Sequence, residues 1–280
     1  MDVASGDVQV ECRNCGRSVA STMVSDCNGC CLTCLKSISR AADDGRCTSE
    51  QEEQTIGRVG GEKAHTYGEI TPLGFRRLAK RFGMNEADTF TDLGSGLGRA
   101  CIQAAREFHV RRAVGVELAA SRHRLALAER EREPEAVASR VELIEADCAD
   151  EALWATGGAV SGTTLIFAGS LLFGEELMER LARRIECCAS VRAVATLKRF
   201  AVSGGGGAAT GGANGGGVGG GTGCFSCGLS GFHMLNGAEE YETSWTAPLR
   251  PGAGSGVRDP GAPVFLYVRD GLSLTGHIDA

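Results

Sequence analysis

The sequence predicts an α/β fold in which a parallel sheet carries helices on both faces. Strand-like runs recur through the middle of the chain: TFTDL, RAVGVE, VELIEA, TLIFA and VRAVATL. Helix-like runs lie between them, including RACIQAAREF, SRHRLALAERE and GEELMERLARRIECC. This alternation is typical of parallel sheets, because each crossover between parallel strands passes over one face of the sheet. Ligands of such sheets bind beyond the carboxyl ends of the strands.

The alternating region opens with a helix that the sequence places within residues 71–83. Thr71 is a typical N-cap residue, Pro72 suits the first helical turn, and Gly83 suits the end of a helix. Three apolar side chains recur at helical spacing and are expected to face the core: Phe75, Leu78 and Phe82. The basic residues of the segment fall on its other faces: Arg76, Arg77, Lys80 and Arg81.

Three zones divide the chain. Residues 1–50 are rich in cysteine, residues 51–64 are interpreted as a linker, and residues 65–280 are expected to form the main domain. The glycine-rich tract at 203–223 cannot bury apolar surface, so we expect a flexible insertion there. Strand-like sequence resumes after the tract at GFHMLNG, YETSWT and PVFLYVR, which indicates that the tract interrupts the domain without ending it.

The composition excludes several classes of protein. The 280 residues carry a formal net charge of −6, so the chain as a whole is not attracted to nucleic acid or to an acidic membrane. No apolar run approaches the roughly 20 residues that cross a bilayer. The amino terminus lacks the pattern of an export signal, so the 13 cysteines are expected to be thiols and metal ligands rather than disulfides.

The stretch TFTDLGSGLGRA, residues 89–100, has the pattern of a strand, a glycine-rich turn and a helix start. Gly94 and Gly96 fit a dinucleotide-binding turn, but Arg99 occupies the position of its third glycine, and the phosphate-loop pattern is absent. Asp92 at the strand end would repel a diphosphate. The same carboxylate favours a cofactor with an ammonium or a sulfonium, and S-adenosylmethionine carries both.

Two further acids follow the next strands. Glu117 ends the second strand about 20 residues after the glycine turn, where a carboxylate can accept both hydroxyls of a ribose. Asp147 ends the following strand and can accept from an adenine amino group. Three acids at three successive strand ends therefore predict a site for S-adenosylmethionine.

Six motifs carry a resemblance to a known family. They are HTYGEIT (65–71), FTDLGSGLGR (90–99), GVEL (115–118), LIFAGSLLFGEE (165–176), ETSWT (242–246) and PVFLYV (263–268). In this order they resemble the disruptor-of-telomeric-silencing (Dot) family of histone H3 lysine methyltransferases. That resemblance implies the seven-stranded class I (Rossmann-like) methyltransferase fold rather than the SET fold, and the YGE–DLGSG pair is its most specific part.

The resemblance implies a role for each residue of the cofactor site. The loop expected to fold over the methionine end of the cofactor consists of Tyr67, Gly68 and Glu69. The turn expected beneath that end contains Asp92, Gly94 and Gly96. Glu117 resembles the ribose acceptor and Asp147 the adenine acceptor, while Cys148 stands where the family commonly has an aromatic residue against the adenine.

The residues expected at the transferred methyl group follow from the same resemblance. Phe173 and Trp245 resemble the walls of the lysine channel. The family usually has a pair of asparagines near the methyl group, and this chain has Gly169 and Ser170 instead. We expect Ser170 to supply one polar group there.

The cofactor residues predict an S-adenosylmethionine-dependent methyltransferase, and the resemblance implies that its substrate is a lysine of nucleosomal histone H3 and its location the nucleus. An apolar channel and the sulfonium charge would both lower the pKa of the substrate lysine from its ordinary value near 10.4, so no general base is assigned. The candidates for weak DNA contact are short basic groups, such as Arg76, Arg77, Lys80 and Arg81, or Arg111 and Arg112. Two alternatives stay open: a methyltransferase of a non-histone protein lysine, and a zinc-dependent adaptor with weak activity.

The cysteine-rich front predicts a metal site. Cysteines two residues apart bind zinc well, because the turn between them directs both thiolates to one metal ion. The simplest ligand set for one structural zinc combines two such pairs: Cys12, Cys15, Cys31 and Cys34. Cys27 with Cys30 is the competing second pair.

Overall fold

The computed structural model describes residues 8–12, 17–21, 31, 33, 34, 36, 44, 45, 48–201, 228–244 and 261–274. The glycine-rich tract at 203–223 lies outside the described residues, as do Cys15, Cys27, Cys30 and Trp245. Within the described part of the chain, no helix is both long enough and apolar enough to cross a membrane.

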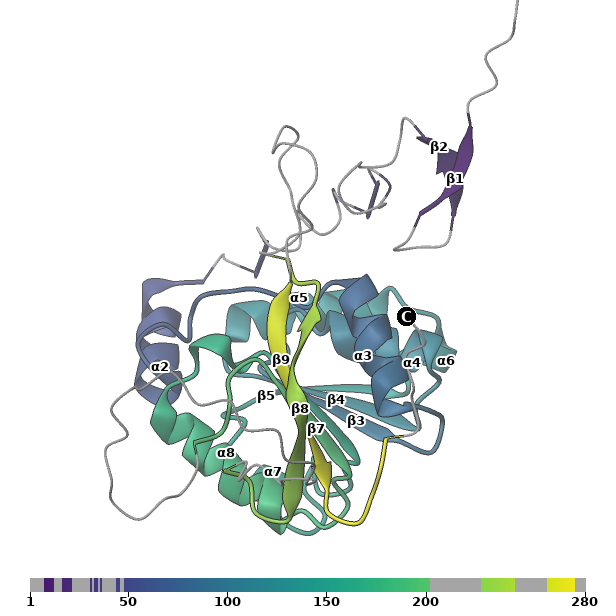
Figure 1. Ribbon diagram of the computed structural model, residues 1–280. Coiled ribbons are helices and arrows are strands. Elements are labelled where there is room, and N and C mark those ends of the chain that lie inside the picture. Colours follow the sequence, from purple (N-terminus) through teal and green to yellow (C-terminus); the bar gives the residue numbers. More distant parts are fainter. Residues whose placement is uncertain are drawn as a thin grey trace, which may run out of the picture.

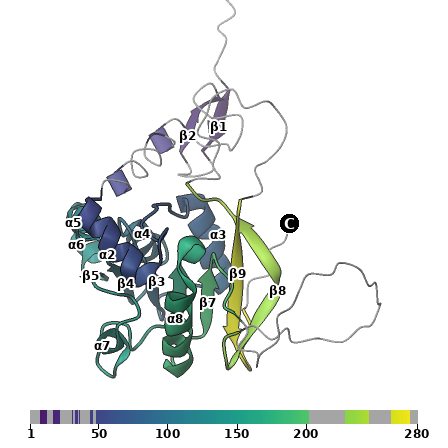
Figure 2. The ribbon, with the colours of Figure 1, turned by 90° about the vertical axis from the view of Figure 1, so that its left-hand side faces the viewer.

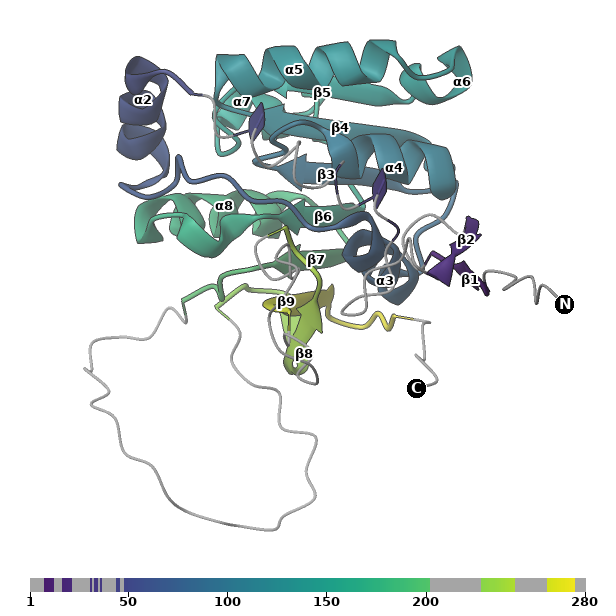
Figure 3. The same ribbon diagram turned by 90° about the horizontal axis from the view of Figure 1, so that it is seen from above.

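One seven-stranded sheet forms the centre of the molecule (Figure 1). From edge to edge its strands are β5 (Val141–Glu145), β4 (Arg112–Glu117), β3 (Thr89–Leu93), β6 (Leu165–Ala168), β7 (Ala193–Thr196), β9 (Ala262–Arg269) and β8 (Phe232–Tyr241). Figure 3 shows this order from above. The pairings from β5 to β7 are parallel, and β9 runs antiparallel to both of its neighbours. This topology confirms the expected class I methyltransferase fold.

The order of the strands also places the ligand site. Along the chain, β3, β4 and β5 progress toward one edge, and β6 then returns to the other side of β3. A crevice opens at such a reversal beyond the carboxyl ends of the strands. The glycine-rich turn follows β3 directly, so it lies at this crevice.

Helices cover both faces of the sheet. One face packs against α3 (Pro72–Phe82), α4 (Arg99–Glu107) and α5 (Ala120–Glu131). The opposite face packs against α7 (Glu151–Trp154) and α8 (Glu175–Cys187). Two short elements complete the body: α6 (Glu135–Ala138) before β5, and the 3-10 turn η2 (Ser170–Leu172) after β6. Each face of the sheet therefore has its own hydrophobic core.

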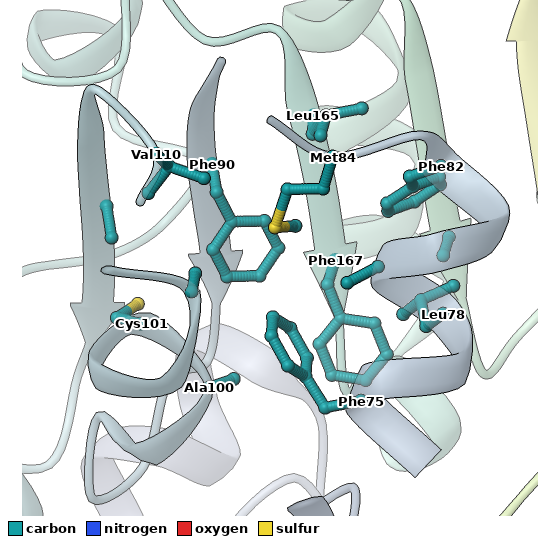
Figure 4. Close-up of a cluster of buried hydrophobic side chains, with 14 of the residues drawn as sticks. Phe75, Leu78, Phe82, Met84, Phe90, Ala100, Cys101, Val110, Leu165 and Phe167 are labelled. Carbon is teal, nitrogen blue, oxygen red and sulfur yellow. The ribbon is translucent and has the colours of Figure 1, made fainter. Parts of the chain in front are cut away.

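The helix expected within residues 71–83 is confirmed as α3. The hydroxyl of Thr71 accepts a hydrogen bond from the Gly74 amide at 3.1 Å, and Gly83 ends the helix in the left-handed region with φ 60°. Its three apolar side chains are fully buried: Phe75, Leu78 and Phe82. Figure 4 shows Phe75 against the ring of Phe90 from β3, and the two ring centroids lie 5.3 Å apart.

The segment interpreted as a linker, 51–64, contains most of a regular helix, α2 (Glu50–Gly60). A capping box begins this helix, because Ser49 and Glu52 each accept a hydrogen bond from the other's backbone amide, at 3.2 and 2.9 Å. The end of α2 packs against the start of α8, where the Gly174 amide donates to the Gly60 carbonyl at 2.6 Å. Figure 3 shows the two helices side by side.

The amino-terminal zone contributes a separate antiparallel hairpin. Its strands are β1 (Gln9–Glu11) and β2 (Ser18–Ala20), which pair only with each other among the described residues. Figure 2 shows this hairpin outside the seven-stranded sheet.

Candidate active site

A pocket of about 950 Å³, including its open mouth, lies at the carboxyl ends of β3, β4 and β6. Every residue expected to bind the cofactor lines the pocket: Tyr67, Gly68, Glu69, Asp92, Gly94, Gly96, Glu117, Asp147 and Cys148. The structure thus gathers residues that are separated by up to 81 positions in the chain (148 − 67) around one cavity.

The glycine turn forms the floor of this pocket. Gly94 and Gly96 have φ of 81° and 54°, a region that L side chains rarely adopt. A Cβ atom on Gly94 would lie 3.1 Å from the ring of Phe173, and one on Gly96 would lie 2.7 Å from the ring of Tyr67. The turn therefore needs glycine for its backbone conformation and for the close approach of two aromatic rings.

Asp92 places a buried carboxylate beside this turn. Its Oδ1 atom has no hydrogen-bond partner among the described residues. Burial raises the pKa of the Asp92 carboxyl well above its ordinary value, and the negative charges of Glu69 and Glu117 raise it further. A buried carboxylate without a partner is costly, and a cation that enters the pocket would relieve that cost. The amino group of S-adenosylmethionine is a cation of the required kind.

Glu117 is held in place by the backbone around it. Its two carboxylate oxygens accept hydrogen bonds from the amides of Gly96 and Ala119, both at 2.8 Å. Arg122 lies 3.9 Å from the same carboxylate. Each carboxylate oxygen can accept a second hydrogen bond, so Glu117 retains one acceptor site per oxygen for a pair of ribose hydroxyls.

Asp147 and Cys148 form the side of the pocket that follows β5. One oxygen of Asp147 accepts from the Ala149 amide at 2.9 Å, and the other pairs with Arg180 at 2.7 Å. Burial raises the pKa of the Cys148 thiol, so this side chain is neutral at physiological pH. It offers an adenine ring a small apolar surface.

The segment from Tyr67 to Glu69 forms the roof. The half-buried Glu69 pairs with Arg99 at 3.4 Å, and its backbone exchanges hydrogen bonds with Ser244 at 3.0 and 2.7 Å. The guanidinium of Arg122 lies 5.0 Å from the ring centroid of Tyr67, a cation–π distance. Arg99, Arg122 and Ser244 therefore all help to hold this segment in place.

The residues expected at the methyl group fall in three places. Phe173 lines the pocket next to Gly94. Ser170 is fully buried, it is not among the lining residues, and its hydroxyl accepts a hydrogen bond from the Lys198 amide at 3.1 Å. Trp245 lies outside the described residues, directly after Ser244.

Several residues of the site were not predicted from the sequence. Ile56 and Val59 of α2 line the pocket, and the capping box of that helix was the signal that could have placed them. Arg122 is buried and donates to the carbonyls of His65 and Gly45, which join the roof to the start of α5. These contacts span 57 and 77 positions of the chain, and nothing in the local sequence indicates them.

Comparisons with known proteins agree with this geometry. Residues 61–205, more than half of the chain, match the family model described as "Histone methylation protein DOT1". No curated protein matches the chain.

Solved structures also share similarity with the chain. An RNA methyltransferase from Salinibacter ruber in complex with S-adenosyl-L-homocysteine is 25% identical with a TM-score of 0.36, over 44% of this chain and 72% of that one. A SAM-dependent methyltransferase from Thiobacillus denitrificans is 16% identical with a TM-score of 0.36, over 45% of this chain and 48% of that one. The CcbJ methyltransferase from Streptomyces caelestis is 17% identical with a TM-score of 0.37, over 45% and 49%. The chain thus spans about half the length of the last two proteins.

The match to the family model, the order of the seven strands and the acidic, glycine-floored pocket agree with one another. The chain therefore belongs to the DOT1 family of histone methylation proteins and is an S-adenosylmethionine-dependent methyltransferase.

Proposed function

We propose that this enzyme methylates the side-chain amine of a lysine in nucleosomal histone H3. The observation that supports the site most strongly is the buried carboxylate of Asp92, whose Oδ1 lacks a partner among the described residues and which lies beside the glycine turn. A cationic ligand would stabilise the ionised form of this group, and the family match supports S-adenosylmethionine as that ligand. The histone substrate rests on the family alone.

The pocket residues would hold the cofactor by three carboxylates. Asp92 would accept from the amino group, Glu117 from the ribose hydroxyls, and Asp147 from the adenine amino group. When bound, S-adenosylmethionine supplies an electrophilic methyl carbon on a sulfonium. Tyr67 and Phe173, whose rings lie close to the glycine turn, would exclude water from that carbon.

The acceptor amine must reach the methyl group in its neutral form. An apolar channel disfavours the ammonium and lowers the pKa of the lysine. We assign Phe173 to one wall of this channel, because it is the aromatic residue that faces the turn at Gly94. Trp245 and Ser170 stay predictions for the same end of the site. The methylated product is a cation, and an aromatic wall stabilises it through its π face.

Replacing Phe173 with alanine is expected to lower kcat about tenfold, since loss of one aromatic wall costs roughly 1–2 kcal/mol. Affinity for S-adenosylmethionine is expected to stay within about threefold of the original, because the three carboxylates are unchanged. Single-turnover methylation and calorimetric titration measure the two quantities separately. Phe108→Ala is the matched control, since Phe108 packs with Phe75 on α3 and does not line the pocket. Equal kcat values for the two variants would show that Phe173 does not form a wall of the lysine channel.

Contact with nucleosomal DNA receives little support from the predicted basic groups. Arg76, Arg77 and Arg81 pair with Glu107, Glu242 and Glu239, respectively, at 2.6 to 2.9 Å. Arg112 likewise pairs with Glu142. Since these charges are already matched, we infer that recognition of the nucleosome depends on the histone more than on these arginines.

The substrate is tested by incubating the full chain with labelled S-adenosylmethionine and three acceptors: reconstituted nucleosomes, free histones and a cell extract. Label on histone H3 within nucleosomes is the expected result. Label confined to another protein in the extract would replace the histone proposal with a non-histone lysine methyltransferase. Cofactor binding without label in any acceptor would favour the adaptor alternative.

A further inference from the structure

We propose that Cys12, Cys31 and Cys34 bind one structural zinc ion, and that this metal centre anchors the segment that packs on the roof of the cofactor pocket. The Sγ atoms of the three residues all lie within 4.8 Å of one another. Those of Cys12 and Cys34 are 3.9 Å apart. A tetrahedral zinc with Zn–S bonds of about 2.3 Å separates its sulfurs by about 3.8 Å, whereas a disulfide bond measures about 2.05 Å.

The backbone around the cluster supports the same assignment. Cys12 follows β1 directly, and its amide donates to the carbonyl of Arg17 at 2.9 Å, which closes the hairpin beside the thiol. The amide of Cys31 donates to the sulfur of Cys12 at 3.2 Å. Hydrogen bonds of this kind orient a metal ligand and stabilise its thiolate form. Two parts of the chain, 19 residues apart, are thus joined at one sulfur.

The surroundings of the cluster explain why a metal is needed. All three cysteines are buried, yet the hydrophobic cluster they form includes only Val19 besides themselves among the described residues. Segments of this size rarely bury enough apolar surface to fold, and a structural metal is a common substitute. Thiolate ligands favour zinc over magnesium or calcium, which prefer oxygen. The Cys12-x-x-Cys15 spacing makes Cys15 the sequence's candidate for the fourth ligand, and Cys15 lies outside the described residues.

Gly45, which lies 11 residues after Cys34, contacts residues of the active site. The carbonyl of Gly45 accepts a hydrogen bond from Arg122 at 2.8 Å. A Cβ atom on Gly45 would lie 2.1 Å from the ring of Tyr67, so the backbone of Gly45 packs directly on that ring. Arg122 in turn lies beside Glu117, the residue assigned to the ribose. A metal that fixes the cysteine-rich zone would therefore restrict the roof of the pocket.

The metal assignment is tested by the zinc content of the full chain, expressed with added zinc and purified without chelator. Mass spectrometry of the metals is expected to find about one zinc per chain, as in structural sites, and a value near zero in Cys31→Ser. Cys187→Ser is the matched control, because Cys187 is exposed on α8 and is not one of the proposed ligands. The Cys187→Ser variant is expected to contain as much zinc as the original chain. Zinc near zero in the original chain, or equal zinc in Cys31→Ser, would overturn the site. If Cys31→Ser does not fold, the original chain is instead loaded with cobalt in place of zinc, and its absorption spectrum is recorded. Absence of the thiolate–cobalt absorption band would overturn the site.

The anchoring role is tested by the affinity for S-adenosylmethionine, which requires no methyl acceptor and so does not depend on the proposed substrate. Zinc-depleted chain and Gly45→Val are both expected to bind the cofactor at least about threefold more weakly, a change of roughly 0.7 kcal/mol. Gly45→Val is expected to keep its zinc, because the substitution displaces Tyr67 without touching the cysteines. Unchanged affinity after zinc removal would overturn the anchoring role.

Discussion

Replacing Gly94 with arginine is expected to weaken the binding of S-adenosylmethionine at least about 100-fold, which is roughly 2.7 kcal/mol. Gly94 has φ 81°, which strains any other residue, and a Cβ atom there would lie 3.1 Å from the ring of Phe173. The guanidinium would also stand beside the Asp92 carboxylate and take the place assigned to the cofactor's amino group. Calorimetric titration measures the loss, and methylation of every acceptor should disappear with it.

Gly162→Arg is the matched control for this experiment. Gly162 is exposed, has no neighbour within 4 Å of an added Cβ, and precedes β6 at the end opposite the pocket. The same chemical change is therefore expected to leave cofactor affinity unchanged there. Binding by Gly94→Arg within about threefold of the original chain would show that the glycine turn does not hold the cofactor.

Asp92→Asn is expected to weaken cofactor binding and at the same time to stabilise the cofactor-free protein. Loss of a hydrogen bond between two charged groups costs roughly 1.5–3 kcal/mol, or about 10- to 100-fold in Kd. Without the cofactor, however, the buried carboxylate opposes folding, because its environment raises the pKa of Asp92 well above the ordinary value. An amide removes that charge and is expected to raise Tm by a few degrees, since about 1 kcal/mol corresponds to roughly 2–4 °C in a chain of this size.

The sign of the pH dependence follows from the same raised pKa. The folded chain keeps the Asp92 proton at pH values where the unfolded chain has lost it, so Asp92 lowers stability as pH rises from the ordinary carboxyl pKa through the raised one. Cofactor binding has the opposite dependence. Because the ammonium pairs with the ionised carboxylate, affinity is expected to rise with pH until Asp92 is ionised in the empty pocket. Both dependences should be weaker in Asp92→Asn.

Thermal unfolding and titration at several pH values check these expectations. Asp150→Asn is the matched control, because Asp150 is an exposed N-cap residue, and asparagine caps a helix about as well as aspartate. That variant is expected to match the original chain in both measurements. A lower Tm for Asp92→Asn, together with unchanged affinity, would mean that Asp92 is a structural residue rather than a ligand of the cofactor.

Local sequence determined the parts of the structure that depend on local physics. Thr71, Pro72 and Gly83 predicted the limits of α3 because caps act through hydrogen bonds within one helical turn. Alternating strand-like and helix-like runs predicted the parallel sheet. The positions of Glu117 and Asp147 at the ends of two strands predicted that both would line one pocket. Each of these inferences needs only the period of the pattern and the rule that ligands bind at the carboxyl ends of parallel strands.

Contacts between distant segments could not be predicted in this way. The sequence from 51 to 64 is polar, and α2 is held by its capping box and by packing against α8, which follows more than 100 residues later. Arg122 appears in the sequence as one of several surface arginines, yet it is buried between Gly45, His65 and Glu117. Such placements depend on tertiary pairing, which leaves no local periodicity in the chain.

A crystal structure of the full chain with S-adenosylhomocysteine, which keeps the amino group of the cofactor, is the most direct measurement of the proposed site. We expect the cofactor in the pocket at the carboxyl ends of β3, β4 and β6, with its amino nitrogen about 2.7–3.2 Å from Oδ1 of Asp92. Its ribose hydroxyls should reach Glu117. Cofactor density outside this pocket, or an amino group directed away from Asp92, would contradict the site.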